Sequence, residues 1–280
     1  MNNSSGKPYW WQFWVQLIRI GGLPFQLSPC KLPQNEGPKL HQAAAHNEVV
    51  IIFNPGGWGD AALSEATDFA PILQGIQKTL ESLGYQSIIV PYSRVVPGLL
   101  GKLAATKEQL NSFKHTSEIQ TRDLAELSKN FPYKKFLVTG FSVGGGLSGK
   151  TLKNIADLPN VCGITVGVPG WYSTHSSEKS LVLNNGSQDP ISVGDVRTVA
   201  IHVFRCPFRW LRSRFTNRSL SLALAMQFPH HDYPWSSPEV GLPIANFLAN
   251  HFKSQPLSPR GTLRPPASKL PEPFHSPGPG

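Results

Sequence analysis

The sequence has few cysteines and no long hydrophobic run, and both absences limit the class of protein. Its three cysteines, Cys30, Cys162 and Cys206, lack the spacing of metal ligands and cannot all pair with one another. Free thiols in a reducing compartment are the simplest interpretation. No run reaches the roughly 18 apolar residues typical of a membrane-spanning helix. Residues 10–20 are apolar, but no small-residue cleavage site follows them. We therefore expect a cytoplasmic protein that needs neither a metal nor another cofactor, with a peripheral position at a membrane as an open alternative.

Acidic residues are also scarce. The 280 residues include 26 lysines and arginines against 17 aspartates and glutamates, for a net charge of +9. No acidic residue occurs between Asp195 and Asp232, an interval rich in arginine and aromatic residues. Its arginines are Arg197, Arg205, Arg209, Arg212, Arg214 and Arg218. A solvated basic face, contact with an anionic membrane, or attraction of an anionic acyl substrate would each explain them. Nucleic acid is not an expected partner, because no recognised binding motif accompanies the charge.

Composition divides the chain into three parts. A hydrophobic fraction of 40% is sufficient for one large α/β domain, which we place at residues 48–253. Residues 1–47 form an aromatic N-terminal segment, in which positions 10, 11, 14, 17 and 18 share one helical face. That segment either packs on the domain as a helix or strands, or lies on a membrane as an interfacial helix. Within it, residues 28–42 are interpreted as a linker or surface loop. Residues 254–280 contain eight prolines and are expected to be disordered.

The central region alternates short apolar runs with amphipathic stretches. Strands are predicted at residues 48–53, 86–90, 136–139, 161–167 and 180–184, and helices at 71–83, 117–130, 147–156 and 238–252. Such alternation predicts a mainly parallel sheet with helices on both faces. Residues 191–228 are ambiguous. We favour a helix at 192–204 and a last strand at 220–226 over a strand at 198–204 followed by a helix.

One short motif suggests chemistry. Residues 140–144 read Gly-Phe-Ser-Val-Gly, a G-x-S-x-G pattern that directly follows a predicted strand and precedes a predicted helix. A serine on a strained strand-to-helix turn is exposed as a nucleophile, and small neighbours avoid a collision between the strand and the helix. Ser142 is therefore the candidate nucleophile. The pattern alone occurs by chance, and its context is what makes it specific.

A serine nucleophile needs a base and a carboxylate that orients the base, and both should follow strands of the sheet. Asp189 comes directly after the strand at 180–184, although a turn or a helix cap would also explain an aspartate before Pro190. His230 and His231 lie between that point and the last helix. We choose His231 because a proline-started helix follows seven residues later, and His230 stays an alternative.

The oxyanion that develops when a serine attacks a carbonyl group also needs hydrogen-bond donors. The backbone N–H of Val143 lies at a predicted helix start, where donors are unpaired and the helix dipole is positive. A second donor is expected from residues 54–60, where Gly56, Gly57 and Gly59 allow the backbone to approach a ligand and Trp58 could line a pocket. A tight turn into a helix is the alternative explanation of these glycines.

With these residues the chain resembles the serine-type α/β-hydrolases over residues 48–252, and the order Ser142, Asp189, His231 is the order of that family. The resemblance implies that Ser142 is the nucleophile, His231 the base and then acid, and Asp189 its orienter. It implies that Gly57 or Trp58, with Val143, donates to the oxyanion. The chain departs from the family at Asn54-Pro55, where His-Gly is common, and in the long interval from Asp189 to His231.

The resemblance also implies an α/β-hydrolase fold with a reduced cap, since residues 167–180 are a short span. The expected function is a serine hydrolase that cleaves a small-molecule ester or acyl substrate, lipid esters and thioesters included. The alternative is a non-catalytic α/β-hydrolase-like binding or membrane-associated module.

Overall fold

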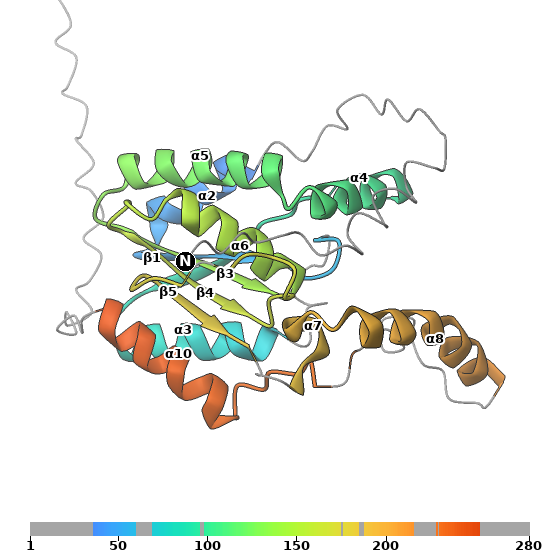
Figure 1. The fold of residues 1–280 in the computed structure, drawn as a ribbon. Helices are drawn as coiled ribbons and strands as arrows, with labels where there is room; N and C mark the ends of the chain where they lie inside the picture. Colours follow the sequence, from blue (N-terminus) through green and yellow to red (C-terminus); the bar gives the residue numbers. More distant parts are fainter. Residues whose placement is uncertain are drawn as a thin grey trace, which may run out of the picture.

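A five-stranded parallel sheet with the order β2-β1-β3-β4-β5 lies at the centre of the protein (Figure 1). The computed structural model describes residues 36–59, 69–95, 98–174, 176–184, 188–215, 228 and 230–252. Its strands are β1 (Val49–Asn54), β2 (Ser87–Pro91), β3 (Lys135–Phe141), β4 (Val161–Val166) and β5 (Ser180–Leu183). Every neighbouring pair is parallel. The five predicted strands are therefore confirmed.

The central strands are buried on both faces, as their unbroken apolar sequence requires. Every residue of β1 and of β4 is buried. Alternate residues of β1 point to opposite faces of the sheet: Ile51 belongs to one core cluster and Ile52 to the other.

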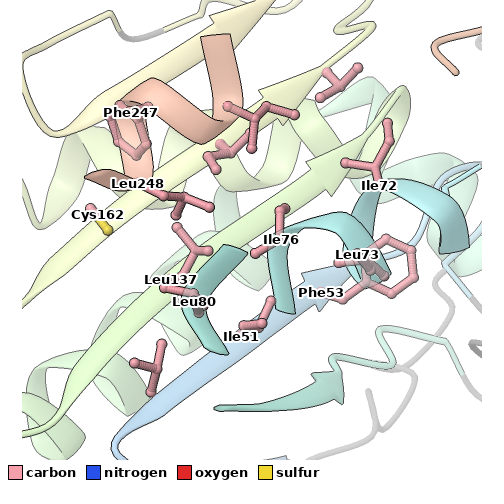
Figure 2. Close-up of a cluster of buried hydrophobic side chains, with 14 of the residues drawn as sticks. Ile51, Phe53, Ile72, Leu73, Ile76, Leu80, Leu137, Cys162, Phe247 and Leu248 are labelled. Atoms are coloured by element: carbon pink, nitrogen blue, oxygen red, sulfur yellow. The ribbon is translucent and has the colours of Figure 1, made fainter. Parts of the chain in front are cut away.

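Helices cover both faces of the sheet, as predicted. On one face lie α3 (Ala70–Ser82) and α10 (Pro238–His251); on the other lie α2 (Glu36–His46), α5 (Lys114–Asn130) and α6 (Val143–Asn154) (Figure 1). Figure 2 shows the first of these two cores. Ile51, Phe53 and Leu137 of the sheet face a row of residues from the two helices, namely Ile72, Leu73, Ile76, Leu80, Phe247 and Leu248.

The loop predicted at residues 28–42 is wrong from Glu36 onward, where α2 begins. Leu40 and Ala44 of this helix are completely buried in the core on its face of the sheet. This tertiary packing outweighs the local loop signal of Gly37 and Pro38, and proline is tolerated in the first turn of a helix. The aromatic stretch at residues 10–20 and the proline-rich tail lie outside the described residues.

Three further helices lie toward the carboxyl ends of the strands: α4 (Leu99–Leu110), α7 (Pro190–Val193) and α8 (Val196–Phe215) (Figure 1). The ambiguous segment is thus helical where we favoured a helix, although Gly194, at φ +78°, separates α7 from α8. A strand at 198–204 is wrong, and the strand predicted at 220–226 lies outside the described residues. The described part of the β4–β5 connection contains no helix, which agrees with a reduced cap.

None of the helices that the structure describes has the length and apolar character needed to cross a membrane.

Candidate active site

Ser142 lies between the end of β3 and the start of α6, at the carboxyl edge of the sheet. Its backbone has φ 53° and ψ −124°, and its N–H donates to the carbonyl oxygen of Val166 at 2.9 Å. A non-glycine residue with positive φ typically costs about 1–3 kcal/mol, so the surrounding structure must hold it there. This is the backbone conformation expected of a serine on a nucleophile elbow.

Two glycines allow the close packing that creates this turn. A Cβ atom at Gly140 would collide with the backbone of Gly144, and a Cβ at Gly144 would collide with the carbonyl groups of Asn54 and Pro55. The first turn of α6 therefore lies directly against the end of β1. Any larger side chain at Gly144 would push the helix away from the loop that follows β1.

A buried amide network fixes the end of β1. Asn54 is completely buried, and its Nδ2 donates to Ser148 Oγ at 2.8 Å. Gln120 Nε2 donates to Asn54 Oδ1 at 2.9 Å, and Thr151 Oγ1 donates to Gln120 Oε1 at 2.8 Å. These bonds join β1 to α5 and α6. They give a structural reason for asparagine at the position where the family resemblance would favour histidine.

Arg94, just after β2, holds the loop at residues 54–59 through its carbonyl groups. Its guanidinium Nη1 donates to the Pro55 oxygen at 2.9 Å and its Nη2 to the Gly57 oxygen at 2.8 Å. Gln109 Nε2 also donates to the Gly57 oxygen, at 2.8 Å. The N–H of a trans peptide points opposite to its C=O, so these bonds turn the N–H groups of Gly56 and Trp58 away from Arg94.

The same loop lies beside the serine turn. A Cβ atom placed on Gly56 would be 3.7 Å from Ser142 Cβ and 3.3 Å from the Phe141 carbonyl oxygen. The Trp58 ring lies against α4, where its Nε1 donates to Thr106 Oγ1 at 3.3 Å. The loop predicted to supply an oxyanion donor therefore adjoins Ser142 in the fold.

Asp189 is completely buried and accepts hydrogen bonds from four groups. Its Oδ1 accepts from the N–H of Ile191 at 2.9 Å, which makes it the N-cap of α7. Its Oδ2 accepts from Ser192 Oγ at 2.6 Å, from the Tyr233 hydroxyl at 2.7 Å and from His231 Nδ1 at 2.7 Å. Asp189 is thus both the helix cap considered from the sequence and the partner of His231.

These donors decide the charge of the carboxyl group. Burial alone would raise the pKa of Asp189, but the hydrogen bonds from His231, Ser192 and Tyr233 outweigh it and hold the pKa well below its usual range. Sequence reasoning missed Ser192 and Tyr233. Their positions, three residues after Asp189 and two after His231, are a weak signal that becomes clear only in the fold.

His231 lies next to the serine turn. Its ring centroid is 5.0 Å from that of Phe141, the residue before Ser142, and a Cβ at Gly167 would come within 2.9 Å of His231 Cε1. With Nδ1 on Asp189, the buried Nε2 is the ring atom left for chemistry, and in this structure it makes no hydrogen bond with the described residues, Ser142 among them. His230, in contrast, is exposed.

The two described cysteines, Cys162 and Cys206, are buried free thiols, as expected. Burial raises the pKa of the Cys162 thiol to about 12, so it is protonated at neutral pH. Among the residues that the structure describes, no three histidines, cysteines or acidic residues gather as metal ligands do.

No family model and no curated protein matches this chain. A search of solved structures finds a cutinase of Trichoderma reesei in complex with a C11Y4 phosphonate inhibitor. The match has a TM-score of 0.44 and 15% identity, and it covers 67% of this chain and 87% of the cutinase chain. The parallel sheet with helices on both faces that the sequence predicts is present in this chain, and the strand–Ser142–helix turn lies at its carboxyl edge, an arrangement consistent with an α/β-hydrolase fold.

Replacement of Arg94 by leucine should destabilise the protein by about 1–3 kcal/mol, because the buried carbonyl group of Pro55 loses its donor, while the Gly57 carbonyl keeps the bond from Gln109. Arg122, exposed on α5, is the matched control, and its replacement by leucine should change stability by less than about 0.5 kcal/mol. Urea unfolding of both variants measures the difference. Equal effects would show that Arg94 does not hold the loop.

Replacement of Asp189 by asparagine should cost stability at neutral pH and progressively less in acid. The folded-state pKa of Asp189 is depressed, so the carboxylate stabilises the fold above the ordinary aspartate pKa. That contribution is lost as the pH falls toward the folded-state value. Unfolding free energies of wild type and Asp189→Asn should be measured in urea from pH 7 down to about pH 2. The difference between them should shrink progressively as the pH falls below about 5. A gap that stays constant would contradict the depressed pKa.

Proposed function

We propose that this protein is a serine hydrolase that cleaves carboxylic esters, lipid esters and thioesters included, through an acyl-enzyme on Ser142. The observation that carries the proposal is the 2.7 Å hydrogen bond between His231 Nδ1 and the buried, ionised Asp189. It leaves the Nε2 atom of a histidine that lies beside the serine turn as the atom that can exchange a proton.

The proposed reaction begins with proton transfer. Asp189 accepts the Nδ1–H of His231, which selects the tautomer with a lone pair on Nε2. As Nε2 takes the proton of Ser142, Oγ attacks the ester carbonyl carbon, and the protonated histidine then gives its proton to the departing alcohol or thiol. Water activated in the same way releases the acid and restores Ser142. Asp189 stays ionised throughout and stabilises the imidazolium, helped by the hydroxyls of Ser192 and Tyr233.

Donors for the developing oxyanion come from two backbones in this proposal. One is the N–H of Val143 in the first turn of α6, where the helix dipole adds positive potential. The other is an N–H of residues 57 or 58. Hydrogen bonds to the carbonyl groups of Gly56 and Gly57 fix the peptides that carry these two N–H groups, and Gly57 and Trp58 stay the two candidate donors.

A non-catalytic binding module is the second candidate, because no hydrogen bond joins His231 to Ser142 in this structure. Catalytic hydrogen bonds are often long or misaligned without substrate, so the missing hydrogen bond alone does not favour a lost activity. The variants below separate the two functions.

Replacement of Ser142 by alanine should lower kcat for a short p-nitrophenyl ester by at least about 1,000-fold, since no acyl-enzyme can form. Ser82, at the end of α3 on the surface, is the control serine, and its replacement by alanine should leave the rate unchanged. Full activity of Ser142→Ala would exclude Ser142 as the nucleophile.

The two adjacent histidines give a sharper comparison. His231→Asn should lower kcat by at least about 1,000-fold, because asparagine cannot carry the proton. His230→Asn should keep kcat within about twofold, because His230 has no place in the proposed proton transfer. Asparagine also tolerates the φ of +61° found at His230, so this variant should fold normally. A larger loss in His230→Asn than in His231→Asn would reverse the assignment of the base.

A further inference from the structure

Helix α8 exposes a row of large apolar side chains. Ile201, Phe204, Phe208 and Leu211 are 43%, 73%, 74% and 51% exposed. In Figure 1 the helix extends past the carboxyl ends of the strands, away from the sheet. Exposure of this much apolar surface along one helix is unusual for a surface that faces only water.

The exposed row is one face of the helix. The four residues follow the spacing i, i+3, i+7 and i+10, which places them together on a helical surface. Cys206 and Ser213, on the opposite side, are 5% and 4% exposed and pack toward the protein. The helix therefore has an inner side that anchors it and an outer side that carries the four exposed apolar residues.

Positively charged side chains lie beside the apolar row. Arg197, Arg205, Arg209 and Arg212 are exposed, and α8 contains no acidic residue. The acid just before the helix, Asp195, accepts hydrogen bonds from Thr198. We call the apolar row and these four arginines the α8 face.

We propose that the α8 face binds the surface of an anionic phospholipid bilayer. Phenylalanine and leucine side chains would enter the boundary between headgroups and acyl chains, while the arginines contact lipid phosphates. Both the apolar row and the arginines make contacts in this arrangement. A convex helix can lie on a flat bilayer surface, so no groove is needed on the protein.

Charge favours a lipid surface over two other possible occupants of the α8 face, which are residues 1–35 of the same chain and a second copy of the protein. Residues 1–35 contain Lys7, Arg19 and Lys31 and no acidic residue, so their charge would repel the α8 face. A second copy that met the same face would bring its arginines against these. An anionic lipid surface supplies the opposite charge.

The position of the face matters for the proposed hydrolase. Helix α7 begins immediately after Asp189, and α8 follows it after Gly194. Ile201 and Arg205 also line a pocket of about 400 Å³ that includes Gln188 and His230, the neighbours of Asp189 and His231. If Ser142 is catalytic, lipid bound at α8 would place the carboxyl edge of the sheet near the membrane. The binding itself does not depend on catalysis.

Sedimentation of the full chain with vesicles tests the proposal. The protein should sediment with phosphatidylglycerol–phosphatidylcholine vesicles and much less with vesicles of pure phosphatidylcholine. Binding to the charged vesicles should fall as the salt concentration is raised. Arg197→Gln/Arg205→Gln/Arg209→Gln should weaken binding by about 100-fold. Lys78→Gln/Lys129→Gln/Lys153→Gln removes the same charge from exposed positions on α3, α5 and α6 and should weaken it far less.

The apolar part has its own pair of variants. Phe204→Ala/Phe208→Ala should weaken binding by at least about tenfold, whereas Leu242→Ala, at a position 61% exposed on α10, should not. Ser142→Ala should bind vesicles like the wild type, so a failure of the proposed catalysis leaves this test intact. Thermal unfolding followed by circular dichroism checks that each variant is folded.

Three results would overturn the proposal. The first is equal binding to charged and neutral vesicles, or none to either. The second is binding that is lost in Trp10→Ala/Trp14→Ala but kept in the α8 variants, which would place the contact in the N-terminal segment. The third is a change from dimer to monomer in Phe204→Ala/Phe208→Ala on size-exclusion chromatography, which would make the face an interface between copies.

Discussion

The close approach of α6 to the end of β1 is the constraint on which the candidate site depends. Gly144 lies against the carbonyl groups of Asn54 and Pro55, so only glycine fits there. This contact brings the strained Ser142 turn beside the loop at residues 54–59. It also places the positive end of the α6 dipole at the same point of the sheet edge. The candidate site combines residues that follow two strands, and the lack of a side chain at Gly144 allows them to come together.

Buried polar groups then hold the backbone in place. The Asn54 amide ties β1 to α5 and α6, and Arg94 fixes the carbonyl groups of the loop. Asp189 is satisfied by four donors, two of which are hydroxyl groups of Ser192 and Tyr233. Each of these groups would be costly to bury alone, and each is paired. These polar side chains at the sheet edge are therefore held by hydrogen bonds within the protein.

Sequence patterns predicted the parts of this arrangement that are local. An unbroken apolar run such as β1, and a serine between a strand and a helix, can be recognised within a dozen residues. The order of elements also led to Asp189 and His231, and the structure brings their side chains together. Their catalytic roles stay predictions.

Contacts between distant segments could not be predicted in this way. Arg94 and Gln120 act across 37 and 66 residues, and nothing in their local sequence indicates a carbonyl or amide partner. For the same reason the local sequence of residues 36–42 predicts a loop. Their helical state comes from Leu40 and Ala44 packing on the sheet, and the local glycine and proline favour a loop. Tertiary burial decided both cases.

The most direct test of a catalytic Ser142 is a covalent label. The folded protein, treated with a fluorophosphonate, digested and mapped by mass spectrometry, should carry one adduct on Ser142, and protein unfolded in urea beforehand should carry none. Reaction at Ser142 requires the activated oxygen that His231 and Asp189 are proposed to provide. An unlabelled folded protein, or an adduct on another serine, would contradict the account.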